Sequence, residues 1–172
     1  MGRYEFTRLL EMKLSFLLYF ILFSLNLGAF DQFVLANKDV VKIDKIFRTE
    51  YEIIKGLSGI ASDNFADDEA ALFVFRHNSD RQFGMPQTFF NIDIVYLDKD
   101  LSVVHIDRDM EKSPYFFYPI STGRVTKCHY VLEFKSSSPY VKTIQKGDKL
   151  KWKSDHFSLE QISGIIPYRK LE

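Results

Sequence analysis

Residues 83–98 read FGMPQTFFNIDIVYLD, and the fold that we predict is arranged around this stretch. It opens with a turn-prone Gly-Met-Pro and continues as an apolar strand that carries one carboxylate, Asp93, near its middle. Successive side chains of a strand point to opposite faces, so Asp93 shares a face with Val95 and Leu97. We therefore expect this carboxylate to be partly buried, where it needs hydrogen-bond donors or a shifted pKa.

Further strands are predicted on both sides of this stretch. The clearest alternation of apolar and polar residues runs through residues 125–135, which predicts a strand. Thr49 and Glu52 have the spacing of a capping box, which predicts a short helix, and residues 77–80 (HNSD) are typical of a turn. Other strands are expected at residues 40–47, 70–75, 101–106 and 149–153, and a second short helix at residues 138–144.

Short strands that do not alternate with helices favour an antiparallel or mixed sheet. We predict a mainly β fold of the α+β class, in which a single compact sheet curls into a small barrel or sandwich and carries two short helices.

Composition excludes several classes of protein. The chain has 172 residues, 46% of them hydrophobic and 27% charged, which is typical of one globular domain. Lys plus Arg and Asp plus Glu both number 23, so no excess of positive charge attracts polyphosphate and no nucleic-acid partner is expected. Cys128 is the only cysteine, so the fold cannot contain an internal disulfide.

The first 36 residues are predicted to form a signal peptide or an N-terminal membrane anchor. Lys13 precedes the apolar run LSFLLYFILFSL of residues 14–25, which is the pattern of a secretory leader. Cleavage is expected after Ala36, or after Ala29 at a less favourable sequence. We therefore expect an extracytoplasmic protein, periplasmic or secreted, which contacts the membrane only if this segment stays uncleaved.

The remainder divides into a β-rich globular domain at residues 37–153 and a C-terminal extension at residues 154–172. The extension is expected to form an edge strand or a loosely packed tail.

Seven short motifs in order resemble domain-of-unknown-function family 192 over about residues 40–153. The motifs are Thr49-x-x-Glu52-x-x-x-Gly56-Leu57, Leu72-Phe73-Val74-Phe75, Phe83-x-Met85-x-x-Thr88, Asp93-Ile94, Ser121-x-Gly123, Tyr130-Val131-Leu132-Glu133 and Gly147-Asp148. The chain departs from the family pattern at Gly84, Pro86 and Gln87, where Trp, a basic residue and Asn are usual. The resemblance implies a compact β-rich domain, often exported, without an established activity.

Asp93 and His105 are the candidates for acid–base chemistry. A three-residue turn at residues 98–100 would place His105 opposite Asp93, whereas a two-residue turn would place Ile106 there. No Ser or Cys nucleophile is evident beside the pair. Asp93 is also explained as a structural group whose oxygens accept hydrogen bonds from the adjacent turn, and we favour this interpretation.

Candidate ligand-binding residues lie in two segments besides this pair. Met85, Gln87 and Thr88 follow the turn at the start of residues 83–98, and Tyr115 and Tyr118 flank two phenylalanines. The aromatic segment is either an exposed platform for a ligand or a lid over the sheet. The four histidines lack the spacing of metal ligands, so neither a metal nor a cofactor is expected.

Two functions follow from these features. The first is an extracytoplasmic binding or accessory domain for an unidentified small ligand or protein partner, without a catalytic constellation. The second is a hydrolase-like enzyme that uses Asp93 and His105 as an acid–base pair.

Overall fold

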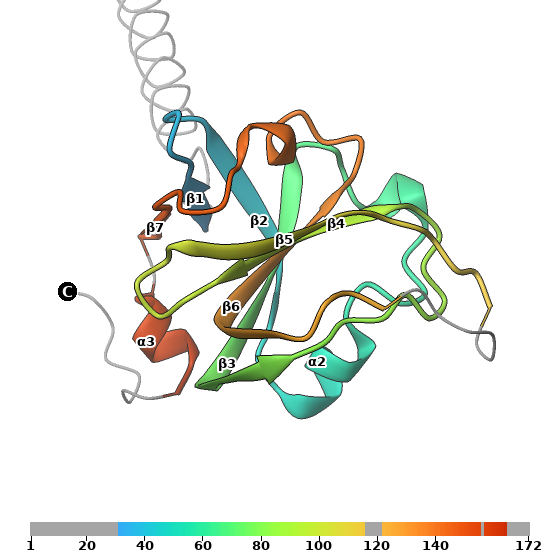
Figure 1. The fold of residues 1–172 in the computed structure, drawn as a ribbon, viewed down its shortest axis with the longest axis horizontal. Coiled ribbons are helices and arrows are strands. Elements are labelled where there is room, and N and C mark those ends of the chain that lie inside the picture. The colour runs from blue at the N-terminus through green and yellow to red at the C-terminus, as the bar shows by residue number, and fades with distance from the viewer. Residues whose placement is uncertain (1–30, 116–121, 156, 165–172) are drawn as a thin grey trace, which may run out of the picture.

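Seven strands form one mixed sheet in the order β5-β4-β6-β3-β2-β1-β7, which curls into a half-barrel (Figure 1). The computed structural model describes residues 31–115, 122–155 and 157–164. The strands are β1 (Gln32–Val34), β2 (Val40–Phe47), β3 (Glu69–Arg81), β4 (Ile92–Leu97), β5 (Val103–Met110), β6 (Thr126–Lys135) and β7 (Lys151–Lys153). The helices are α2 (Glu50–Lys55) and α3 (Leu159–Ile162), with 3-10 turns η1 (Ser62–Asn64) and η2 (Val141–Thr143). The predicted fold class is confirmed.

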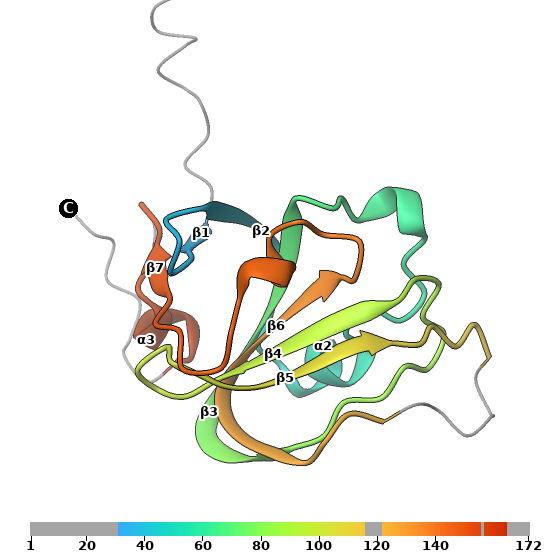
Figure 2. The same cartoon turned by 45° about the horizontal axis from the view of Figure 1, so that its top comes forward.

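The two edges of the sheet approach each other at one end of the half-barrel (Figure 2). Only β2 and β3 run parallel, and the other neighbouring pairs are antiparallel. Just before β7, the amide of Leu150 donates to the carbonyl of Leu101, and the amide of Val103 donates to Asp148 O. The chain that leads into β7 is therefore bonded to the start of β5, which brings the two edge strands together.

The sheet is buried on both faces because its central strands carry apolar side chains on alternate sides. In β4, Ile92, Ile94 and Tyr96 pack into one hydrophobic core, while Val95 and Leu97 pack into the other. The first core is covered by α2 and by the segment of residues 82–90. The second core is covered by η2 and α3. The alternation read from the sequence of this strand is thus the alternation between two cores.

Helix α2 begins at the predicted capping box. Thr49 Oγ1 accepts from the amide of Glu52, and Glu52 Oε2 accepts from the amide of Thr49 at 2.9 Å. The helix ends at Gly56, which has a φ of +47° and brings its backbone close to the ring of Phe73. A Cβ at Gly56 would lie 3.2 Å from Phe73 Cζ. Helix and sheet therefore approach closely at this point.

Three local predictions differ from the structure. Residues 77–80 do not form a turn but continue β3, with a register irregularity between Val74 and Ser79, because pairing with β6 extends the strand past its polar residues. Of the expected helix at residues 138–144, only the 3-10 turn η2 forms. Within residues 157–164, the described part of the C-terminal extension after Asp155, the chain forms neither an edge strand nor a loose tail. Helix α3, capped by Ser158, buries Leu159 and Ile162 against the core.

Strand β1 lies inside the stretch that the sequence assigned to the leader. It pairs with both β2 and β7, and its central residue Phe33 is fully buried. Residues 1–30, which contain the apolar run, are outside the described residues. No described helix combines the length and apolar character needed to cross a membrane.

Candidate functional site

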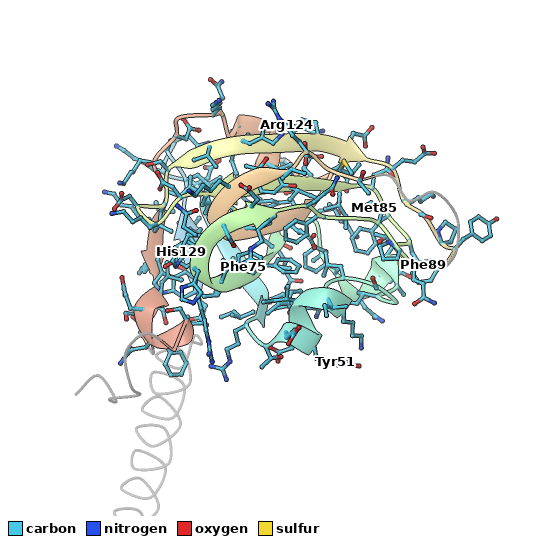
Figure 3. All side chains as sticks on the ribbon, turned by 60° about the horizontal axis from the view of Figure 1, so that its bottom comes forward. Tyr51, Phe75, Met85, Phe89, Arg124 and His129 are labelled. Carbon is cyan, nitrogen blue, oxygen red and sulfur yellow. The ribbon has the colours of Figure 1, made fainter. Side chains whose placement is uncertain are left out.

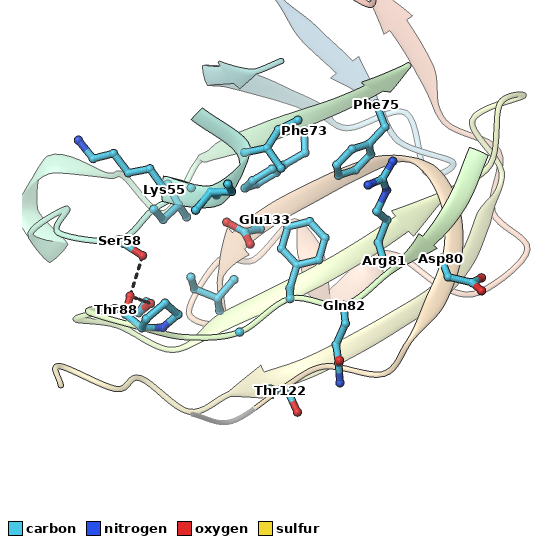
Figure 4. Close-up of a pocket in the computed structure, with 18 residues that line it drawn as sticks. Lys55, Ser58, Phe73, Phe75, Asp80, Arg81, Gln82, Thr88, Thr122 and Glu133 are labelled. Carbon is cyan, nitrogen blue, oxygen red and sulfur yellow. Dashed lines mark hydrogen bonds between the residues drawn. The ribbon is translucent and has the colours of Figure 1, made fainter. Parts of the chain in front are cut away.

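A pocket of about 470 Å³ lies between α2 and the curved sheet (Figure 4). Its apolar lining includes Phe73 and Phe75 of β3, Ile92 of β4, and Phe83. The Phe83 ring meets the Phe73 ring edge-on, with 5.0 Å between centroids. The polar side chains of the lining are Lys55, Ser58, Asp80, Arg81, Gln82, Thr88, Thr122 and Glu133. The lining thus combines aromatic and aliphatic side chains with several polar ones, and such concave sites are where small molecules usually bind.

The turn after α2 is hydrogen-bonded to the segment on the other side of the pocket. Ser58 Oγ donates to the carbonyl of Pro86 at 2.7 Å, and the amide of Gly59 donates to Gln87 O at 2.9 Å. These bonds fix the end of the helix to the segment that forms the opposite wall (Figure 4). The walls are thus tied together at one end while the cavity between them stays unfilled.

Glu133 places a carboxyl at the bottom of this pocket (Figure 4). Glu133 lies in the inner strand β6, opposite Ala71 of β3 and Ile94 of β4. It is 5% exposed. Within the described parts of the chain, its side chain has no hydrogen-bond or ion-pair partner. Burial alone raises the pKa of Glu133 to about 8. The carboxyl is therefore mostly protonated at neutral pH and offers an O–H donor to the cavity.

A carboxyl at this place costs folding free energy, because a buried polar group without a partner loses its hydration without replacement. An apolar side chain would suit the centre of the sheet better. A strongly shifted, partnerless carboxyl in a cavity is the mark of a candidate functional group. Glu133 is accordingly the centre of the candidate site.

Arg81 borders the same pocket from the end of β3. Its guanidinium lies over the ring of Phe75, with Cζ 4.1 Å from the centroid. Its Nε is buried and has no hydrogen-bond partner among the described residues. The ring stabilises part of the charge by a cation–π contact.

The structure places the seven candidate ligand-binding residues at different sites. Thr88 is buried and lines the pocket, whereas Met85 is packed into the core beside it. Gln87 is exposed and has a φ of +50°. Tyr115 is 66% exposed, and Tyr118 lies outside the described residues.

Asp93 is a structural anchor on the face of β4 that points away from the pocket. Its Oδ2 accepts from Arg108 Nη1 at 2.9 Å, and its Oδ1 accepts from the amide of Asp109 at 2.9 Å and from Ser136 Oγ at 2.6 Å. Asp93 is 4% exposed. These contacts favour the structural interpretation, but the donors are Arg108, Asp109 and Ser136 instead of the adjacent turn that the sequence suggested.

The expected pairing of Asp93 with His105 is wrong. His105 lies opposite Tyr96, and Asp107 lies opposite Ile94. The hairpin is longer than expected because Asp98 Oδ1 accepts from the amides of Asp100 and Ser102, and two register irregularities follow along the strands. The hydrolase-like function therefore loses its acid–base pair.

His105 belongs instead to a second polar cluster. Its Nε2 lies 2.8 Å from Asp107 Oδ1, and Asp107 Oδ2 accepts from the buried Tyr96 hydroxyl at 2.8 Å and from the amide of Arg124 at 2.9 Å. Burial and this hydrogen bond raise the pKa of Tyr96. The cluster fixes the chain around Gly123 to the sheet and has the character of a structural network.

Two other chemistries find no support among the described residues. Cys128 is fully buried, and desolvation raises the pKa of its thiol to about 12, so it is a poor nucleophile. No group of three or more His, Cys, Asp or Glu in the described ranges could hold a metal ion.

The family model described as Uncharacterized ACR, COG1430 (DUF192) matches residues 33–152. The chain belongs to this family. No curated protein matches the chain. All the residues that line the Glu133 pocket fall within the matched range, so the pocket is formed by the DUF192 domain itself.

Two solved structures share the fold of this DUF192 domain. One is a protein of unknown function from Novosphingobium aromaticivorans DSM 12444, with a TM-score of 0.58 and 22% identity over 70% of this chain and 84% of that one. The other is a proposed transcription regulator from Sinorhizobium meliloti 1021, with a TM-score of 0.57 and 18% identity over 72% of this chain and 95% of that one. At these identities the likeness shows the fold alone.

The sequence did not single out Glu133 or Arg81 as site residues. Glu133 stands among apolar residues in a strand, and its alternation with Leu132 and Phe134 placed it on a polar face. In the DUF192 domain, α2 covers that face. Ala71, which lies beside Glu133 on β3, has a small side chain and leaves space in front of the carboxyl. A glutamate in the most apolar part of a central strand was the only available signal.

Proposed function

We propose that the protein is an extracytoplasmic binding domain that takes the apolar part of a small ligand into the pocket between α2 and the sheet. The observation that carries this proposal is Glu133, a buried carboxyl that faces the pocket and has no partner among the described residues. A ligand with a hydrogen-bond acceptor would satisfy its O–H, and the apolar body of the ligand would pack against the partly exposed ring of Phe83. The hydrogen bond and the burial of apolar surface both favour binding.

Binding is measured with N-phenyl-1-naphthylamine, a neutral dye that fluoresces in apolar surroundings. We expect saturable binding that Phe83→Ala weakens by about tenfold, since the pocket loses one aromatic wall. Tyr51→Ala is the matched control, because Tyr51 is 74% exposed on the outer side of α2 (Figure 3). Equal affinity in the wild type and both variants would refute the pocket as the binding site.

Export is supported by Lys13 and the apolar run of residues 14–25. A fusion of residues 1–45 to alkaline phosphatase, which is active only outside the cytoplasm, tests this part. We expect an active fusion, and replacement of two leucines in the apolar run by lysine should abolish its activity. An inactive fusion with the native run would contradict the extracytoplasmic location without affecting the pocket.

A further inference from the structure

Arg81 lies on the boundary between the Glu133 pocket and a second cleft. This cleft, of about 960 Å³, runs between α2 and α3. It shares Ile53, Ile54, Phe75 and Arg81 with the pocket. The two cavities therefore meet at the Arg81 side chain. Arg81 borders both cavities, and a group bound in either one can approach its guanidinium.

The second cleft carries a concentration of positive charge. Arg48 and Arg76 line it together with Arg81, and Glu50 is the acidic residue of its lining. Arg76 is exposed and forms no ion pair within residues 31–115, 122–155 and 157–164. The rest of the cleft lining is mixed, with apolar residues such as Val74 and Ile162 beside the polar Gln161. An anionic group would find two cationic side chains there without neutralising partners.

The charge of Arg81 is not balanced from the pocket side. Asp80, its neighbour, points away from the guanidinium (Figure 4), and no ion pair joins the two. Glu133 carries little charge at neutral pH because burial raises its pKa to about 8. The buried Nε–H of Arg81 also lacks an acceptor. Arg81 and Glu133 thus both offer hydrogen-bond donors to a ligand, and neither offers it a negatively charged acceptor.

We propose that the ligand is an amphipathic anion, with its apolar body in the Glu133 pocket and its anionic group against Arg81 and Arg76. This inference rests on the proposed function, because it assigns the class of ligand to the same pocket. A cationic ligand is disfavoured by repulsion from Arg81 in a partly dehydrated site. A neutral ligand would leave the guanidinium without a counter-charge.

Three naphthalene derivatives of similar size distinguish these cases. They are 1-naphthaleneacetate (the carboxylate of 1-naphthaleneacetic acid), 1-naphthaleneacetamide and 1-naphthylmethylamine. At pH 7 these are anionic, neutral and cationic, respectively. We expect the wild-type protein to bind the carboxylate at least about tenfold more tightly than the amide, and the amine more weakly still. Because the interaction is electrostatic, the preference should shrink as salt is raised.

Variants at Arg81 test which side chain is responsible. Arg81→Gln should reduce the preference for carboxylate over amide to less than about threefold, whereas Arg81→Lys, which keeps the charge, should retain part of it. Arg76→Gln should have an intermediate effect. Arg124→Gln is the control, because Arg124 is exposed far from α2 (Figure 3).

The outcomes separate the two proposals. If the amide binds as tightly as the carboxylate, or if Arg81→Gln weakens all three probes equally, the anionic class is refuted while the pocket stands. If the amine binds most tightly, the sign of the charge is wrong. If none of the three probes binds, the pocket itself is refuted, and the inference falls with it.

Discussion

Arg108 holds Asp93 and the turn η2 at the same time. Its Nη1 donates to Asp93 Oδ2 at 2.9 Å and to the carbonyl of Val141 at 2.8 Å, and its Nη2 donates to the carbonyl of Ile144 at 2.6 Å. Val141 and Ile144 are both buried in the core. The ion pair therefore ties β4 and β5 to a segment more than thirty residues away, and its weakening should affect the whole fold.

Asp93→Asn should lower the free energy of unfolding by about 2–3 kcal/mol, because it leaves the Arg108 charge without its counter-ion in a half-buried place. Urea unfolding followed by Trp152 fluorescence measures this change. Asp100→Asn is the control, since its ion pair with Lys99 is exposed and should change stability by less than about 0.5 kcal/mol. A stable Asp93→Asn protein that had lost binding would instead indicate a direct role in the site.

Glu133 should make the protein less stable as the pH rises. Burial raises the pKa of Glu133 in the native state to about 8, whereas the ordinary pKa of a glutamate is 4.5. Between these values the native state binds one proton more than the unfolded chain, so the free energy of unfolding falls by up to about 1.4 kcal/mol per pH unit. Above about pH 8 the contribution levels off.

Glu133→Gln should remove this slope, because glutamine does not titrate. Urea unfolding at several pH values between 5 and 8 measures the difference between the variant and the wild type. Glu111→Gln, at an exposed carboxyl, should leave the slope unchanged. Parallel pH dependences for Glu133→Gln and the wild type would show that Glu133 is not protonated in the native state.

Gly123→Ala should destabilise the protein by about 1–3 kcal/mol through overpacking. An added Cβ would collide with Asp107 Oδ2 and would lie 2.8 Å from Tyr96 Oη. Thermal unfolding of Gly123→Ala alone and combined with Asp107→Ala gives the coupling between the two sites. The cost of Gly123→Ala should be smaller when Asp107 is absent, and equal costs in both backgrounds would exclude the collision as the cause.

Removal of β1 should disrupt the sheet. Phe33 and Leu35 are buried, and the Phe33 ring meets the Trp152 ring with 5.2 Å between centroids. A protein that starts at Asp31 should unfold cooperatively, whereas one that starts at Asn37 loses the partner of both β2 and β7. Trp152 fluorescence and thermal unfolding compare the two.

The need for β1 limits where the leader can be cleaved. If the exported protein is cleaved, N-terminal sequencing should find cleavage after Ala29, because cleavage after Ala36 removes β1. A mature protein that began at Asn37 and was stably folded would contradict this prediction.

The sequence predicted the strands in which apolar and polar residues alternate regularly. Residues 40–47 and 125–135 were read correctly to within a residue, as was the capping box at Thr49, because these features depend on neighbours close along the chain. It did not predict β1, because the apolar residues of β1 follow a leader-like run, nor the continuation of β3 through residues 77–80. Strand β1 forms because it pairs with the nearby β2 and the distant β7, and β3 continues because β6 pairs with its last residues.

The sequence by itself determined the fold class, the family and the burial of Asp93, because alternation and motif order are local properties. Only the tertiary structure decided that Asp93 meets Arg108 instead of His105, since one capped turn and two register irregularities shift the hairpin. It also decided that Glu133 faces a cavity. Whether the polar face of a strand meets water or another element depends on packing that no local pattern encodes, and here α2 covers it.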